Sequence, residues 1–202
     1  MVTVKINDNI IGNGKTYFIA EAGLNHNGDI KIAKQLIDSA FDCGADAVKF
    51  QTFKTEEFLA KSSQYFDLFK NVELTYEEFG ELYDHAKSVG ITFFSAPFDI
   101  TSADALKELN VPCFKIASSD LTNTPLLNHI SKFNTPMIIS TGLANINEVE
   151  EAIQICQKNG NDKLIILHCV ANYPTQPEET NLNAMTTLRE KFSLPTGYSD
   201  NG

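Results

Sequence analysis

The sequence predicts an α/β protein of the TIM-type (β/α)8 barrel class, truncated after about the seventh strand. Short apolar, β-branched runs alternate with longer stretches in which apolar residues recur at helical spacing. The short runs are continuously apolar, as is typical of strands in a parallel sheet that is covered on both faces. About seven such units follow one another without reversal, and no G-x-G-x-x-G or P-loop motif is present. These observations favour a barrel over a doubly wound nucleotide-binding sheet.

Seven strands are predicted from the apolar runs. In chain order they are residues 16–20 (TYFIA), 47–51 (AVKFQ), 91–96 (ITFFSA), 113–117 (CFKIA), 136–140 (PMIIS), 163–169 (KLIILHC) and 195–199 (PTGYS). A closed barrel of this class has eight strands, and a missing closing unit would leave unpaired strand edges. We therefore expect a fragment, a split gene product, or a protomer that another chain completes.

Helices are predicted between these strands. They cover residues 30–43, 75–88, 101–109, 125–133, 146–158 and 181–191. Gly44 follows the first helix and Gly160 the fifth, as glycines at helix C-termini do. Thr75 and Glu78 have the spacing of a capping box at the start of the second helix, and Gly90 follows its end. Ahead of the first strand, residues 2–11 are predicted to form a small hairpin, and residues 1–202 together form one incomplete barrel domain.

The composition excludes several classes of function. A formal net charge of −10 disfavours a nucleic-acid-binding surface. No apolar run approaches the roughly 20 residues of a membrane helix, and the N-terminus lacks the pattern of a secretion signal, so a cytoplasmic location is expected. The four cysteines are scattered without a Cys-x-x-Cys pair, and we expect all four to be buried thiols.

Polar residues gather where the predicted strands end, which is where barrels of this class carry their active sites. Lys49 and Lys115 lie inside apolar strands, where an outward-facing lysine would be buried at high cost. With nearby hydroxyls and backbone N–H groups, lysines that point into the barrel mouth would form a cradle for phosphate and carboxylate. The alternative is that each lysine pairs with an interior acid such as Glu21 or Asp120.

An ordered series of segments resembles the motifs of the N-acetylneuraminate synthase family, which includes sialic, legionaminic and pseudaminic acid synthases. The segments are IAEAGLNHNGD, ADAVKFQTF, FFSAPFD, FKIASSDLTNTPLL, IISTGLANINEVEEA, LHCVANYPTQPEETNL and GYSDN. The resemblance runs from about residue 17 to the end of the sequence. It implies condensation of phosphoenolpyruvate with N-acetylmannosamine or a related N-acylated amino sugar, giving a nonulosonic (sialic-type) acid and phosphate. It also implies a divalent metal, Mn²⁺ or Mg²⁺, and a homodimer for the full-length protein.

The resemblance implies roles for individual residues. The residues implied to act at the reaction centre are Glu21, Gln51 and Tyr173. Those implied to bind phosphoenolpyruvate are Lys49, Ser95, Lys115, Ser118, Ser140 and Ser199. Asp120 and Tyr173 are implied to contact the sugar. Three alternatives stay open: Glu21 is simply the partner of Lys49, Tyr173 packs its loop, and His168 is a hydrogen-bonded core histidine. Asn25 and His26 are read as turn formers.

The sequence also departs from the family pattern. Ala96 stands where relatives carry a threonine, which removes one hydroxyl from the anion site. Asn201 stands where many relatives carry a histidine that binds the metal, and an amide oxygen suits a harder ion such as Mg²⁺. The segment between Phe53 and Gln64 is shorter than in relatives, and both the eighth strand and the C-terminal antifreeze-like domain are absent from the sequence.

Two further hypotheses remain at this point. The missing strand and the changes at Ala96 and Asn201 favour a non-catalytic barrel that keeps only ligand binding. Another phosphoenolpyruvate or keto-acid aldolase barrel would use Lys49 or Lys115 as a Schiff-base nucleophile, and borohydride would trap that adduct.

Overall fold

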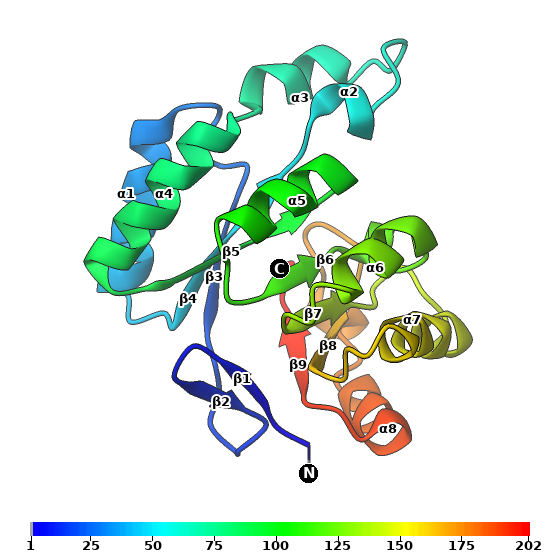
Figure 1. Ribbon diagram of the computed structural model, residues 1–202. Helices are drawn as coiled ribbons and strands as arrows, with labels where there is room; N and C mark the ends of the chain where they lie inside the picture. Colours follow the sequence, from blue (N-terminus) through cyan, green and yellow to red (C-terminus); the bar gives the residue numbers. More distant parts are fainter. Residues whose placement is uncertain (1) are drawn as a thin grey trace. The chain divides into compact units, whose positions relative to one another are not determined.

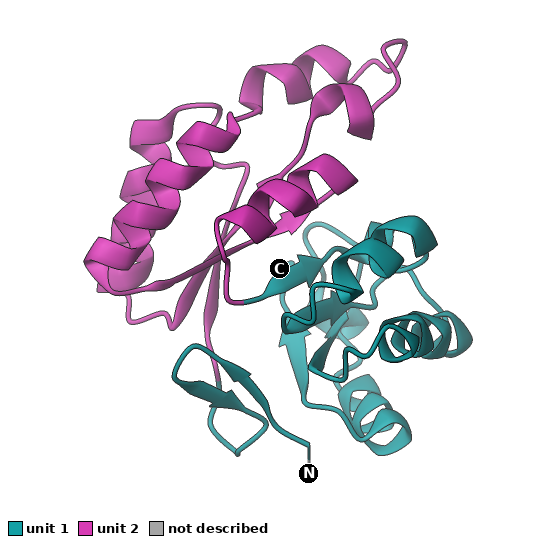
Figure 2. Cartoon of the chain, in the orientation of Figure 1, with its two compact units in different colours: residues 1–16, 113–202 teal, residues 17–112 magenta. Residues whose placement is uncertain are grey.

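The computed structural model describes residues 2–202, and within them helices alternate with parallel strands (Figure 1). The chain divides into two compact units, coloured separately in Figure 2. Residues 17–112 form one unit, and residues 2–16 together with 113–202 form the other. No helix within the described residues is long and apolar enough to cross a membrane.

The unit of residues 17–112 is a three-stranded parallel sheet with helices between its strands. Its elements are β3 (Ile19–Gly23), α1 (Ile30–Asp42), β4 (Ala47–Thr52), α2 (Thr55–Phe58), α3 (Phe66–Val72), α4 (Tyr76–Val89), β5 (Thr92–Pro97) and α5 (Ile100–Glu108). The strand order is β3-β4-β5. Phe50 and Phe94 are fully buried, and helices α1 and α4 lie against each other.

The other unit contains a hairpin and a four-stranded parallel sheet. Its elements are β1 (Val4–Ile6), β2 (Asn9–Ile11), β6 (Phe114–Ile116), the 3₁₀ turn η1 (Ser118–Asp120), α6 (Thr124–Ser131), β7 (Met137–Ser140), α7 (Ile146–Lys158), β8 (Leu164–Cys169), the 3₁₀ turn η2 (Pro177–Glu179), α8 (Asn183–Phe192) and β9 (Thr196–Ser199). The strand order is β6-β7-β8-β9. The predicted hairpin is confirmed, with β1 antiparallel to β2.

The predicted strands and long helices are confirmed with small shifts, and three features differ. Strand β3 lies three residues later than predicted, so Glu21 stands inside the strand and not after it. Helix α2 lies within the segment between Phe53 and Gln64, and α3 follows that segment; neither helix was predicted. Cys43 is exposed at the end of α1, which corrects the expectation that all four thiols are buried; Cys113, Cys156 and Cys169 are buried.

The capping box at the start of α4 is formed as predicted. The backbone N–H of Thr75 donates to Glu78 Oε2 at 2.8 Å, and the backbone N–H of Glu78 donates to Thr75 Oγ1 at 3.2 Å. These bonds satisfy two donors that the first helical turn leaves without intrahelical partners.

Replacing Thr75 by alanine is expected to lower the free energy of unfolding by about 1 kcal/mol, because the helix loses a capping hydroxyl. Thr75 is exposed, so the substitution opens no cavity. Urea unfolding followed by circular dichroism measures the change. Thr186→Ala, at an exposed position inside helix α8, is the control and should leave the stability nearly unchanged. An unchanged midpoint for Thr75→Ala would contradict the assignment of the cap.

Candidate functional site

A buried lysine and several hydroxyls share one face of the β6-β7-β8-β9 sheet. The cross-strand register and the alternation of side chains place Lys115, Ser140 and Ser199 on the same face. Lys115 is 7% exposed, and its Nζ donates to Ser140 Oγ at 2.5 Å and to the Ile116 carbonyl oxygen at 2.9 Å. The structure thus brings Lys115 and Ser140 into contact and places Ser199 on the same face of the sheet, two strands beyond Ser140.

Ser118 lies at the end of β6, in the turn η1, and is held by two neighbours. Its Oγ accepts a hydrogen bond from the backbone N–H of Gly142 at 3.0 Å and lies 3.1 Å from Cys169 Sγ. Because Oγ already accepts from Gly142, its own proton is free to point towards the thiol or towards a ligand. Ser118 is therefore a positioned hydroxyl donor beside the strand that carries Lys115.

Asp120 is a buried carboxyl in the same turn. It accepts hydrogen bonds from Asn123 Nδ2 at 3.1 Å and from Ser119 Oγ at 3.2 Å. Burial raises the pKa of Asp120 above its ordinary value, while the hydrogen bonds from Asn123 and Ser119 and the charge of Lys115 oppose that rise. This side chain can accept hydrogen bonds from a hydroxylated ligand.

The unit of residues 17–112 holds a second polar group. Glu21 Oε2 and Lys49 Nζ form an ion pair at 2.7 Å; the lysine side chain is 9% exposed and the glutamate 52%. The contact between Glu21 and Lys49 that one alternative predicted is thus confirmed. About half of the Glu21 side chain remains exposed to solvent. Gln51 follows Lys49 by two residues on β4, so both project from the same face.

Gly23 keeps space beside these side chains. Its φ is +52°, and a Cβ placed there would lie 3.0 Å from Glu21 Oε1 and 3.9 Å from Gln51 Nε2. The glycine therefore permits both the left-handed backbone and the approach of the two polar ends.

Ser95 is not brought to this group, and its prediction is corrected. On β5 it pairs in register with Phe50, whereas Ala96 pairs with Gln51, so Ser95 faces away from Lys49. It is fully buried and shares a 2.7 Å hydrogen bond with Thr52. The Ser95 hydroxyl therefore links β5 to β4 on the face of the sheet opposite to Lys49. Ala96 lies on the same face as Lys49 and Gln51. The family resemblance implied a threonine hydroxyl at this position, and alanine does not supply one.

The predicted metal position does not form a metal site among the described residues. Asn201 Nδ2 donates to the Val170 carbonyl oxygen at 2.7 Å, which leaves only Oδ1 as a possible ligand atom. Within residues 2–202, no group of three His, Cys, Asp or Glu side chains is placed to hold a metal ion. These residues therefore do not fit a divalent metal centre on their own.

The remaining candidates have distinct environments. Tyr173 is 77% exposed in the loop after β8. His26 is buried in a turn, where its Nδ1 accepts from the backbone N–H of Gly28 at 3.1 Å, so the reading as a turn former is confirmed. Burial lowers the pKa of His26, and the charge of Glu78 opposes this effect. His168 is buried and hydrogen-bonded to the Thr180 carbonyl oxygen at 2.7 Å, as expected of a core histidine.

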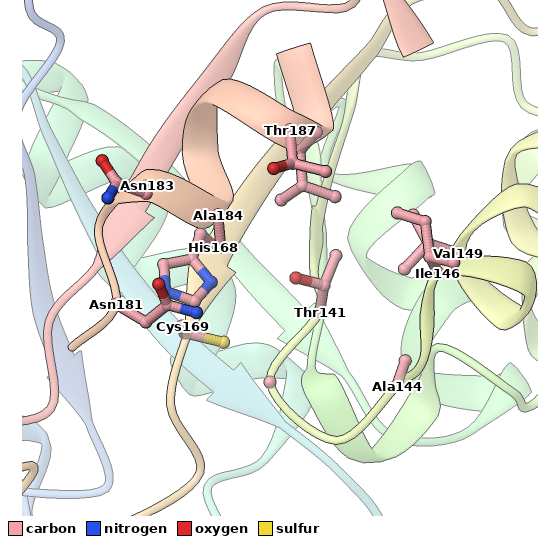
Figure 3. Close-up of a pocket in the computed structure, with 12 residues that line it drawn as sticks. Thr141, Ala144, Ile146, Val149, His168, Cys169, Asn181, Asn183, Ala184 and Thr187 are labelled. Carbon is pink, nitrogen blue, oxygen red and sulfur yellow. The ribbon is translucent and has the colours of Figure 1, made fainter. Parts of the chain in front are cut away.

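Sequence reasoning missed the support that Gly142 and Cys169 give to Ser118. Both residues also line a cavity of about 470 Å³ between helices α7 and α8, shown in Figure 3. The only signal in the sequence was the Ser140-Thr141-Gly142 triplet at a strand end, and Cys169 was read solely as a buried thiol.

Replacing Gly142 by alanine is expected to destabilise the fold by about 1–3 kcal/mol, the range of overpacked sites. The new Cβ would lie 2.7 Å from Cys169 Sγ and 3.1 Å from Ser118 Oγ, so the loop after β7 must shift. Chemical denaturation measures the loss. Gly80→Ala is the control: it lies in helix α4 with its nearest contact at 3.8 Å and should stabilise by about 0.5–1 kcal/mol. Equal effects of the two substitutions would contradict the close contact.

Comparison with known proteins adds three likenesses. The NeuB family profile matches residues 36–201. An uncharacterized protein of Methanocaldococcus jannaschii is 50% identical over 99% of this chain and 60% of its own length. The N,N'-diacetyllegionaminic acid synthase of Campylobacter jejuni is 44% identical over 92% of this chain and 60% of its own length. The chain thus spans about 60% of the length of these curated relatives.

A solved structure gives the fold class. The N-acetylneuraminic acid (sialic acid) synthetase of Leptospira borgpetersenii, determined with citrate, matches with a TM-score of 0.95 and 38% identity over 100% of this chain and 70% of that chain. The fold is accordingly α/β of the TIM-barrel type, and seven parallel strands of it lie within residues 2–202. The predicted fold class is confirmed.

Proposed function

Because the chain belongs to the NeuB family, we propose that it carries the catalytic barrel of an enzyme that condenses phosphoenolpyruvate with an N-acylated amino sugar. The products are a nonulosonic acid and inorganic phosphate. The likeness to a legionaminic acid synthase and to a sialic acid synthetase supports this reaction class. N-acetylmannosamine, or a related acylated amino sugar, is the proposed acceptor.

The observation that carries the proposal is the arrangement around Lys115. A nearly buried ammonium group lies 2.5 Å from Ser140 Oγ, and Ser199 shares its face of the sheet. A lysine removed from water, with a hydroxyl beside it, binds an anion far more strongly than an exposed lysine does. Phosphoenolpyruvate offers a phosphate and a carboxylate to such a cradle, and Ser118 would donate a further hydrogen bond.

The proposed reaction forms two bonds to the carbons of phosphoenolpyruvate and breaks one. Its methylene carbon attacks the aldehyde carbon of the open-chain sugar, a carbon–carbon bond forms, and the aldehyde oxygen takes up a proton. Water then adds to the neighbouring carbon, which has gained cationic character, and the carbon–oxygen bond to phosphate breaks. The sum is one aldehyde, one phosphoenolpyruvate and one water, converted into one keto sugar acid and one phosphate.

Glu21 is the proposed proton acceptor and stabiliser of positive charge in this sequence. Its carboxylate is half exposed, and Lys49 holds it in one orientation at 2.7 Å. A carboxylate fixed in this way can accept the proton of the attacking water. Gln51 and Tyr173 are proposed to line the reaction centre, and Asp120 to accept hydrogen bonds from sugar hydroxyls. The divalent metal that the family resemblance implies stays a prediction for the complete protein, as does the homodimer.

Calorimetric titration of the purified chain with phosphoenolpyruvate, with and without Mn²⁺, tests the proposal. We expect saturable binding with one equivalent of ligand, and phosphate release when N-acetylmannosamine is added. Pyruvate is the matched control ligand, since it lacks the phosphate and should bind much more weakly. Binding of phosphoenolpyruvate without phosphate release would favour the non-catalytic barrel that keeps only ligand binding, and a folded chain that binds neither ligand would contradict the assignment of the cradle.

A further inference from the structure

Cys169 lies at the end of β8, on the face of the sheet that carries the proposed anion cradle. It pairs in register with Ser199 on β9, and Leu167, two residues earlier on β8, pairs with Ser140. Side chains two residues apart on a strand share a face, so Cys169 lies on the face of Ser140 and Ser199. It is a free thiol and is 6% exposed, so water competes little for its hydrogen bonds.

The thiol contacts both Ser118 and the loop that follows β7. Cys169 Sγ lies 3.1 Å from Ser118 Oγ, and a Cβ placed at Gly142 would lie 2.7 Å from the same sulfur. In Figure 3 the Cys169 sulfur points towards the loop that follows Thr141. The backbone N–H of Gly142 also donates to Ser118 Oγ at 3.0 Å. A thiol, a hydroxyl and a backbone amide therefore form one contact group beside the cradle.

The direction of the hydrogen bond between Ser118 and Cys169 depends on what else Ser118 binds. A serine hydroxyl has one proton and two lone pairs, and the Gly142 N–H occupies one lone pair. Without a ligand, the hydroxyl is a stronger donor than the thiol and donates to sulfur. The oxygens of a phosphate or carboxylate only accept, so a bound anion takes the Ser118 proton. The thiol then donates to the remaining lone pair of Ser118.

We propose that Cys169 is a positioning residue for the anion cradle, and that its bond to Ser118 reverses when an anion binds. The thiol accepts from Ser118 in the empty site and donates to it in the occupied site, which turns the hydroxyl proton towards the ligand. Thiol hydrogen bonds are weak in both directions, so the reversal costs little. This inference rests on the proposed function, because Ser118 is taken there as a donor to phosphoenolpyruvate.

Calorimetric titration of variants with phosphoenolpyruvate tests the role of the thiol. Cys169→Ala is expected to raise the Kd about fivefold, the loss of one neutral hydrogen bond. Cys169→Ser keeps a group that both donates and accepts, and its Kd should stay within about twofold. Cys156→Ala is the matched control: this thiol is also buried, but it packs on Met137 Sδ at 4.0 Å, and its loss should leave the Kd unchanged.

A double-variant cycle separates an action through Ser118 from a general effect on the site. In a Ser118→Ala background the hydroxyl is absent, so adding Cys169→Ala is expected to cause no further loss of affinity. A thermal melt of each variant checks that the fold is kept.

Raman spectroscopy of the unmodified chain tests the reversal without any substitution in the protein that binds. The S–H stretching band that is missing in Cys169→Ser belongs to Cys169. A thiol that becomes a hydrogen-bond donor stretches at lower frequency, so this band should move down when phosphoenolpyruvate is added. A thiol with a purely structural role would keep its band in place.

The possible failures of the two proposals are distinguishable. An unmodified chain that does not bind phosphoenolpyruvate contradicts the proposed function and this inference together. If the unmodified chain binds, the inference alone is overturned by an unmoved S–H band or by an unchanged Kd of Cys169→Ala. Equal losses in Cys169→Ala and Cys156→Ala, no recovery in Cys169→Ser, or a further loss in the Ser118→Ala background would also overturn it.

Discussion

Replacing Lys115 by methionine is expected to raise the Kd of phosphoenolpyruvate at least about 100-fold, close to 3 kcal/mol of binding free energy. Lys115 is 7% exposed and its ammonium group lies 2.5 Å from Ser140 Oγ, so a bound anion would meet it with little intervening water. Methionine keeps the unbranched apolar stem and removes only the charge and its donors. A charge pair of this kind is worth far more than one on the surface.

The control for Lys115→Met is Lys158→Met, which removes an exposed charge at the last residue of α7. It changes the net charge equally and should leave the Kd within about twofold, since exposed charges are screened. The substitution also removes the donor to Ser140 Oγ and to the Ile116 carbonyl oxygen, and a thermal melt of each variant checks that the fold is kept. Equal affinities of the two variants would remove Lys115 from the proposed cradle.

The fold could be predicted from the sequence where local pattern and tertiary structure agree. The apolar runs became strands because a parallel sheet of this class is covered on both faces, and the capping box at Thr75 depends on four consecutive residues alone. Helices α2 and α3 could not be predicted, because they have four and seven residues, too few for a periodic pattern. They are held by tertiary contacts: Phe58 and Phe69 pack on Phe53, and Glu73 accepts from the Thr55 hydroxyl at 2.7 Å.

In the candidate site, the sequence predicts the placement of a side chain where that placement depends on one strand alone. Alternation within one strand is sufficient to place Lys49 and Gln51 on a common face. The face of Ser95 depends on its register against β4, which no feature of β5 encodes by itself, and this is why its prediction failed. The cavity beside His168 depends on how α7 and α8 pack and on a single bond to the Thr180 carbonyl oxygen. A single histidine in an apolar strand gives no sign of that packing.

Replacing Glu21 by glutamine is expected to lower the rate of condensation by about 1,000-fold, within the range of lost general-base catalysis. Glutamine has the shape of glutamate and still accepts from Lys49, but it takes up no proton and stabilises no cation. The Kd of phosphoenolpyruvate should stay within about threefold, because the proposed cradle around Lys115 is unchanged. Phosphate release at saturating phosphoenolpyruvate gives the rate, and calorimetry gives the Kd.

The matched control for Glu21→Gln is Glu81→Gln, since Glu81 forms a comparable 2.9 Å ion pair with Lys34 and is 60% exposed in the same unit. A general loss of surface ion pairing would affect both variants alike, whereas a catalytic role affects only Glu21. Full turnover by Glu21→Gln would leave the carboxylate only as the partner of Lys49. A loss of phosphoenolpyruvate affinity equal to the loss of rate would instead assign Glu21 to orienting Lys49 for binding. The ratio of the two losses therefore separates the catalytic role of this carboxylate from its structural one.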